Sequence, residues 1–215
     1  MSSINKRTSV IAQFGLLCAV IVLMAFTPLG YLRIGLIEAT LLMIPVAIGA
    51  IRLGPTAGGL LGGVFGATSF AQCFGMSPFG AVLLGINPLY TFIVCMVPRI
   101  LMGIFVALIY QALMKKEKPN PGGHGLPDVE ELSKRSDGLS MGIAFFASAA
   151  LNTVLFVGFF FVLFGSTEFV RELQGATPFF AFVVSFVGIN GIAEALVATV
   201  AGTFIGTALK RANLI

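Results

Sequence analysis

The stretch NPLYTFIVCMVPRILMGIF, residues 87–105, is long and apolar enough to cross a bilayer, yet Pro98 and Arg99 stand side by side within it. A guanidinium keeps its proton at ordinary pH, and placing one in hydrocarbon costs about 3 kcal/mol even on insertion scales. Pro98 also leaves the carbonyl of Val94, four residues earlier, without its helical donor. The stretch therefore predicts a membrane helix in which Arg99 faces a polar partner.

The rest of the chain is similarly apolar. Of its 215 residues, 57% are hydrophobic and 10% are charged, whereas soluble domains carry about a quarter of charged residues. At about 20 apolar residues for each crossing, the sequence predicts helices over 9–27, 37–51, 55–73, 87–114, 139–165 and 178–209. We therefore expect an all-α integral membrane protein, with a six-transmembrane-helix bundle that forms a single membrane domain over 1–215.

The positive charges predict how this bundle lies in the membrane, because Lys and Arg in short connections are retained in the cytoplasm. With both termini inside, only Arg33 and Arg171 fall on the outer side. The cytoplasmic set is Lys6, Arg7, Arg52, Lys115, Lys116, Lys118, Lys134, Arg135, Lys210 and Arg211. We therefore expect cytoplasmic N- and C-termini. Residues 115–138 then form a flexible cytoplasmic linker between the first four helices, within 1–114, and the last two, within 139–215.

Small residues in two of the expected helices indicate close helix packing. In the helix over 55–73, two series recur every four residues: Gly58, Gly62 and Gly66, and Gly59 and Gly63. This spacing places the glycines on two adjacent stripes where another backbone can approach, and we interpret both as internal packing. Gly15 and Ala19, in the helix over 9–27, offer a smaller surface of the same kind that stays open as a docking face.

Few charged or amide side chains lie deep within the expected spans. They are Arg99, Asn152, Asn190 and Glu194. Asn190 and Glu194 are four residues apart and share one helix face, and polar groups at this depth normally face the bundle interior or a wet cavity. Two hypotheses stay open: Arg99 and Glu194 form a buried ion pair, or Arg99 and nearby asparagines hold an anionic group of a small solute.

The outer ends of the spans supply the remaining candidate contacts. Glu38 is expected to cap the helix over 37–51, because a carboxylate is favoured in a first helical turn; the alternative is that it faces a cavity. Asn87 and Tyr90, at the start of the helix over 87–114, complete the candidate substrate-binding set. The uncharged connection over 72–88 is too interrupted by Gly and Pro to be a span, and we interpret it as a lid.

Enzymatic chemistry and metal binding are not expected. The only histidine, His124, lies in the linker, and the expected spans contain no combination of a nucleophile with a base. Cys18, Cys73 and Cys95 lack the spacing of a metal knuckle or a redox pair, so we interpret them as packing residues. We expect no catalytic residue, no metal and no cofactor.

Two segments carry a resemblance to a known family. The hairpin over 37–69, containing EATLLMIPVAIGAIRLGPTAG, and the segment CMVPRILMG, residues 95–103, resemble the substrate-binding S components of energy-coupling-factor (ECF) vitamin transporters. The resemblance implies a protein of the bacterial plasma membrane that binds a water-soluble vitamin with high affinity and has no ATPase of its own. It also implies docking of the first three helices, with Gly15 and Ala19, on a transmembrane coupling subunit that works with two ATP-binding subunits.

The resemblance is compatible with more than one vitamin. The hairpin and the phrase GATSF, residues 66–70, look most like the pantothenate branch, and Arg99 would suit a carboxylate that a guanidinium grips with two hydrogen bonds. Riboflavin transporters share this style of hairpin, and riboflavin is neutral, so Arg99 would then be structural. Folate or another vitamin of the same transporter class stays open as a further alternative. A membrane scaffold that transports nothing is the alternative from a different class, and it would need no converging polar residues.

Overall fold

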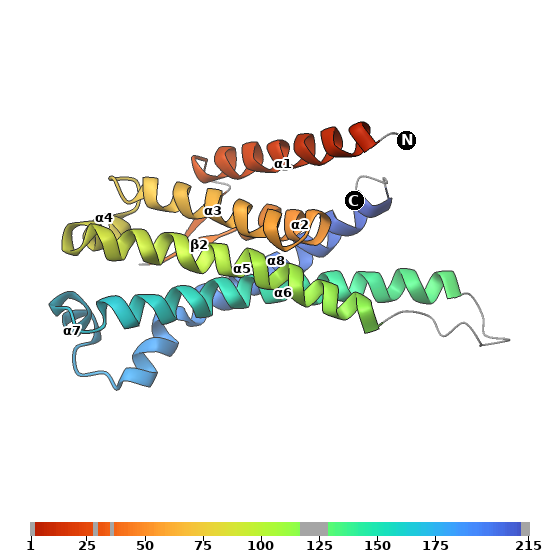
Figure 1. Ribbon diagram of the computed structural model, residues 1–215. Helices are drawn as coiled ribbons and strands as arrows, with labels where there is room; N and C mark the ends of the chain where they lie inside the picture. Colours follow the sequence, from red (N-terminus) through yellow and green to blue (C-terminus); the bar gives the residue numbers. More distant parts are fainter. Residues whose placement is uncertain (1–2, 28–29, 35–36, 117–128, 212–215) are drawn as a thin grey trace.

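The computed structural model describes residues 3–27, 30–34, 37–116 and 129–211, which contain eight helices and one two-stranded hairpin (Figure 1). The elements in chain order are α1 (Ser3–Ala25), β1 (Tyr31–Ile34), β2 (Ile37–Thr40), α2 (Met43–Leu53), α3 (Pro55–Gln72), α4 (Pro78–Ile86), α5 (Pro88–Lys116), α6 (Val129–Phe164), α7 (Glu168–Gln174) and α8 (Phe179–Arg211). The helical bundle predicted from the sequence is confirmed, with the hairpin as an addition.

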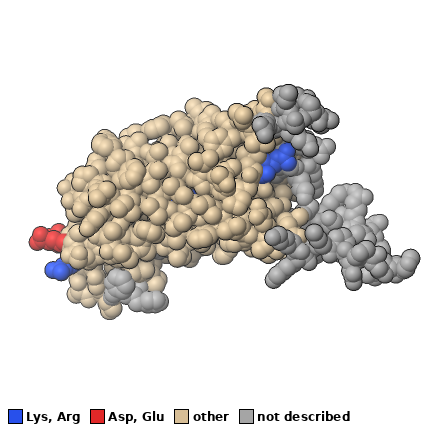
Figure 2. All heavy atoms as spheres, viewed as in Figure 1, with Lys and Arg blue, Asp and Glu red and all other residues tan. Residues whose placement is uncertain are grey.

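The long helices run side by side, and the two ends of the molecule differ. Figure 1 shows α4 and α7 at one end, whereas α1 begins and α8 ends at the other. In Figure 2 the charged side chains in view gather at these two ends, with an uncharged flank between them. Among the described residues, three helical segments are long and apolar enough to cross a membrane: Thr8–Ala25, Pro88–Met114 and Gly138–Phe164. Six spans and cytoplasmic termini stay predictions.

Glycines bring α3 and α5 into direct backbone contact. A Cβ atom added at Gly58 would clash with the carbonyl oxygen of Gly103, and one at Gly62 would clash with that of Arg99. The predicted internal packing of this stripe is therefore confirmed. The second stripe faces the same helix, since a Cβ at Gly59 would lie 2.9 Å from Ile104 Cγ1. This close approach fixes the backbone of Arg99 against α3.

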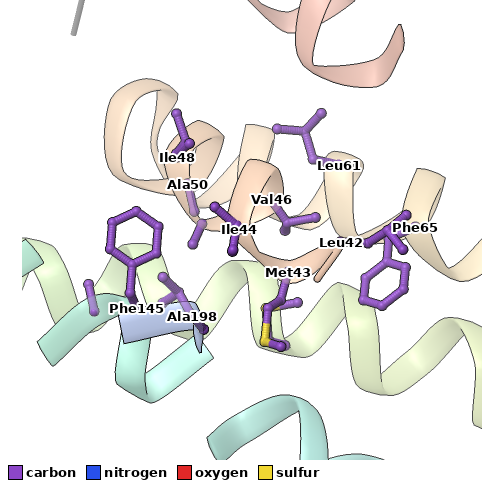
Figure 3. Close-up of a cluster of buried hydrophobic side chains, with 14 of the residues drawn as sticks. Leu42, Met43, Ile44, Val46, Ile48, Ala50, Leu61, Phe65, Phe145 and Ala198 are labelled. Carbon is purple, nitrogen blue, oxygen red and sulfur yellow. The ribbon is translucent and has the colours of Figure 1, made fainter. Parts of the chain in front are cut away.

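The short helix α2 lies in the centre of the molecule, and every residue from Met43 to Ala50 is buried. Its sequence MIPVAIGA contains no polar side chain, so it can be surrounded on all sides. Figure 3 shows its side chains packed among Leu61 and Phe65 of α3, Phe145 of α6 and Ala198 of α8. The buried side chains of α2 therefore connect α3 with α6 and α8.

The hairpin corrects one predicted helix. Residues 37–40 form strand β2, in which Glu38 is paired with Arg33 of β1, and α2 begins only at Met43. The expectation that Glu38 caps a helix is therefore wrong, because α2 has no acidic residue in its first turn. Both strands are rich in β-branched, aromatic and aliphatic residues, which suit a strand. Four such residues at the start of an apolar run are equally compatible with the first turn of a helix, so the strand could not be distinguished from the sequence.

Helix α4 and the first residues of α6 lie outside the predicted spans. The interrupted connection over 72–88 contains α4, which begins at Pro78 with the Ser77 hydroxyl accepting the Gly80 N–H at 3.2 Å. Helix α6 begins at Val129, ten residues before the predicted span, because the charged segment VEELSKRSDG is made largely of residues compatible with a helix. His124 and the rest of 117–128 lie outside the described residues.

Candidate ligand-binding site

The Arg99 side chain replaces a backbone hydrogen bond that Pro98 cannot form. Pro98 lies inside α5 and has no N–H to donate to the carbonyl of Val94. The Arg99 guanidinium takes that place, because its Nη1 donates to the Val94 carbonyl oxygen at 2.7 Å. The side chain therefore folds back along its own helix, and the adjacent proline and arginine of the sequence act as a unit.

The guanidinium lies between two aromatic rings. Its Cζ is 5.4 Å from the centre of the Phe65 ring on α3 and 4.8 Å from that of Phe156 on α6. Both contacts are within the range of a cation–π interaction, and Arg99 is only 8% exposed. Within the described part of the chain no carboxylate forms an ion pair with it, and its Nε has no hydrogen-bond partner. The aromatic rings stabilise the cation but leave a donor unused.

Glu194 of α8 is held by donors of the protein itself. Its Oε1 accepts the backbone N–H of Thr40 at 2.7 Å, and its Oε2 accepts the hydroxyl of Thr153 at 3.3 Å. The carboxylate therefore joins β2, α6 and α8. The described residues contain no direct ion pair between Arg99 and Glu194, so the structure does not support that hypothesis.

Asn152 completes the polar cluster from α6. It is 4% exposed, and its Oδ1 is buried without a hydrogen-bond partner in the described chain. Phe156, one turn further along α6, is the residue that packs on the guanidinium of Arg99. Arg99 of α5, Asn152 of α6 and Glu194 of α8 are thus linked through α6, whose Phe156 contacts Arg99 and whose Thr153 donates to Glu194. These three residues are called the Arg99 cluster below. The cluster retains one unmatched donor, Arg99 Nε, and one unmatched acceptor, Asn152 Oδ1.

Two other predicted contacts, Asn87 and Tyr90, form no described hydrogen bond with this cluster. Asn87 caps α5, because its Oδ1 accepts the N–H groups of Leu89 at 3.0 Å and Tyr90 at 3.1 Å. Tyr90 is 37% exposed and packs edge-on against Phe164, with ring centres 5.9 Å apart. It precedes Arg99 by nine residues, or about 13 Å along a helix axis. Glu38 and Asn190 lie in β2 and α8, but their side chains lie outside the described residues.

Four residues of the cluster were not predicted: Thr40, Phe65, Thr153 and Phe156. Phe156 follows Asn152 by four residues, so their shared helix face was a usable signal. Thr40 contributes a backbone N–H, for which a sequence carries no signal. Phe65 and Phe156 could not be singled out, because the apolar chain contains many phenylalanines.

Gly15 and Ala19 lie on an exposed face of α1. A Cβ atom added at Gly15 would meet nothing within 4 Å. Ile11 and Leu16, close by on the same helix, are 71% and 66% exposed. On its other side α1 packs through Ile21, and its last turn is held by Gln72 of α3, which donates to the carbonyl of Ala25. One side of α1 is thus committed to the bundle and the other is uncovered.

Comparison with known proteins gives two results. A family model described as the ECF transporter, substrate-specific component, matches residues 9–205. The chain is also 31% identical over 188 residues to the pantothenic acid transporter PanT of Lactococcus lactis subsp. cremoris, covering 82% of this chain and 80% of that protein. It is 28% identical over 118 residues to the pantothenate transporter PanT of Leuconostoc mesenteroides subsp. mesenteroides, covering 53% and 56% respectively.

Proposed function

The chain belongs to the family of substrate-specific components of ECF transporters, and from this premise we propose that it captures pantothenate at the Arg99 cluster. It is a multi-pass component of a transporter in the bacterial cell membrane rather than an enzyme. The observation that carries the choice of ligand is the buried Arg99 guanidinium, which lacks a carboxylate partner in the described chain and has an unused Nε donor.

Pantothenate offers the groups that this cluster lacks. Its carboxylate would pair with the Arg99 guanidinium through charge-assisted hydrogen bonds. Its hydroxyl and amide groups include donors for Asn152 Oδ1, and its dimethyl group is apolar, as are Phe65 and Phe156. Riboflavin is neutral and would leave the charge of Arg99 without a counter-charge, so the cluster favours pantothenate. The names of both relatives support the same choice.

The direct test compares two ligands that differ only in the charged group. Purified chain, without ATP, is titrated by calorimetry with pantothenate and with pantothenol, in which an alcohol replaces the carboxylate. We expect pantothenate to bind about 100-fold more tightly, because hydrogen bonds between charged groups contribute up to about 3 kcal/mol. Equal affinities would remove the proposed role of Arg99. If only riboflavin or another vitamin binds, the ligand is wrong.

We propose in addition that α1 docks on a transmembrane coupling subunit that works with two ATP-binding subunits. The uncovered face with Gly15 and Ala19 supports this, because small residues let a second helix approach closely. Gly15→Leu and Ala19→Leu are expected to abolish uptake into cells while calorimetric pantothenate binding stays unchanged. Leu16→Ala, on the same helix, is the control for a general effect on α1. Normal uptake by both leucine variants would contradict the docking face.

A further inference from the structure

Cys73 and Cys95 form a pair of thiols that sequence spacing alone does not associate. Their Sγ atoms lie 3.9 Å apart, at the distance of a sulfur hydrogen bond rather than of a disulfide. Cys73 follows the last residue of α3, and Cys95 lies in α5 between the α5 N-terminus and Arg99. The two side chains are 4% and 7% exposed. They are therefore held together in the interior, at the α4 end of the bundle.

Close backbone contact between α3 and α5 fixes the positions of the two cysteines. A Cβ atom added at Gly66 would lie 2.8 Å from the carbonyl oxygen of Cys95, so α3 and α5 touch about two turns before Cys73. A disulfide needs sulfur atoms about 2.05 Å apart, which leaves an approach of about 2 Å. Forming the bond therefore requires rotation of the two side chains, together with any helix shift that the Cα geometry of a disulfide demands.

Helix α4 covers Cys73. A Cβ atom added at Gly80 would lie 2.6 Å from Cys73 Sγ, so the backbone of α4 rests directly on the thiol. Reagents therefore reach Cys73 when α4 moves away. The charge pattern predicts that this end of the bundle faces the outside of the cell, where disulfides persist more readily than in the cytoplasm.

From this geometry we propose that Cys73 and Cys95 are an oxidisable pair whose disulfide ties the end of α3 to α5. One thiolate attacks an external disulfide, such as oxidised glutathione, and expels one thiol. The second thiolate then attacks the mixed disulfide and expels the other thiol. The protein loses two hydrogen atoms, and the external disulfide is reduced to two thiols.

The pair is connected to the ligand site through α5. Cys95 directly follows Val94, whose carbonyl accepts the Arg99 guanidinium, and it precedes Arg99 by four residues. Drawing Cys95 towards Cys73 shifts the turn that holds this guanidinium. We infer that oxidation lowers the affinity for pantothenate, by about threefold or more, because charge-assisted hydrogen bonds depend on short distances. This second step rests on the proposed function, whereas formation of the disulfide does not.

The test uses the full chain with Cys18→Ala, so that only the pair remains, and the unaltered chain in parallel. Each is incubated in lipid vesicles with oxidised glutathione, denatured and treated with N-ethylmaleimide. Intact mass then counts free thiols, and peptide mapping identifies the linked residues. We expect a Cys73–Cys95 link that dithiothreitol reverses and that Cys73→Ser and Cys95→Ser abolish. Two alkylated thiols, or a single bound glutathione without the link, would overturn the proposal.

Calorimetry of the oxidised and reduced forms then tests the connection to the site. Weaker pantothenate binding by the oxidised form supports it, and equal affinities refute it. If neither form binds pantothenate while the link still forms, the proposed ligand fails and the thiol pair stands. The two proposals are therefore separable in one set of samples.

Discussion

Arg99 and Glu194 are two buried charges in one polar cluster, but the protein treats them differently. Glu194 accepts hydrogen bonds from Thr40 and Thr153 with its two oxygens, whereas Arg99 donates to Val94 and retains an Nε donor without a partner. A buried unmatched polar atom costs about 1–3 kcal/mol. Both oxygens of Glu194 on α8 thus accept hydrogen bonds, whereas Arg99 on α5 keeps an unused donor. We call the α5 side of the cluster open in this sense.

This difference separates two roles that the sequence could not distinguish. A charge that is satisfied by the protein links elements, and Glu194 links the hairpin to two helices that are distant in the chain. A charge with an unused hydrogen-bond donor is available to bind a ligand, and we assign that role to Arg99. Loss of Glu194 should therefore affect mainly stability, and loss of Arg99 mainly ligand affinity.

The largest effect is expected from Arg99→Gln. This change removes the counter-charge for the ligand, so pantothenate affinity should fall about 100-fold while pantothenol affinity changes little. The preference between the two ligands should consequently disappear, which calorimetry measures as a coupling between residue and ligand. The melting temperature of the ligand-free protein should change by only a few degrees, because the guanidinium is incompletely satisfied.

Arg52→Gln is the matched control for this change. Arg52 is exposed, and its Nε donates to Gln13 at 3.2 Å, away from the cluster. Its variant should retain the full preference for pantothenate over pantothenol. A folded Arg99→Gln protein that keeps this preference would show that another residue binds the carboxylate.

The second effect is on stability. Glu194→Ala leaves the N–H of Thr40 without its acceptor, and the loss should destabilise the ligand-free protein by about 2 kcal/mol. Its melting temperature should fall, whereas Glu194→Gln, which keeps an acceptor for Thr40, should recover most of the loss. Glu172→Ala, at an exposed position of α7, is the control. If Glu194→Ala lowers pantothenate affinity more than Arg99→Gln does, the division of roles is reversed.

Much of the fold could be predicted because hydrophobic length is its main determinant. The apolar runs predicted α3, α5 and α8 to within two residues at each end. The hairpin could not be found in this way, because strands of four residues fall below the resolution of a pattern about 20 residues long. The charged start of α6 was missed for the opposite reason, since a helix can continue where its apolar segment ends.

The candidate site could be predicted in its composition but not in its connections. Arg99, Asn152 and Glu194 were identified because polar residues are rare in membrane spans. Their hydrogen bonds depend on which helix faces which, and the decisive partner of Glu194 is a backbone group of a hairpin 154 residues away. Asn87 shows the same limit, because a side chain that could bind a ligand also caps a helix.

The smallest of these effects is expected from Asn152→Leu, and it tests whether the open side of the cluster includes α6. Removing the unmatched Oδ1 should lower the affinity for pantothenate and for pantothenol by the same factor, about tenfold, since a neutral hydrogen bond contributes up to about 1.5 kcal/mol. Ser148→Ala is the control one turn away, because the Ser148 hydroxyl donates to the carbonyl of Phe145 in its own helix at 2.7 Å. A loss confined to pantothenate would place Asn152 at the carboxylate beside Arg99, whereas no loss for either ligand would limit the open side to α5.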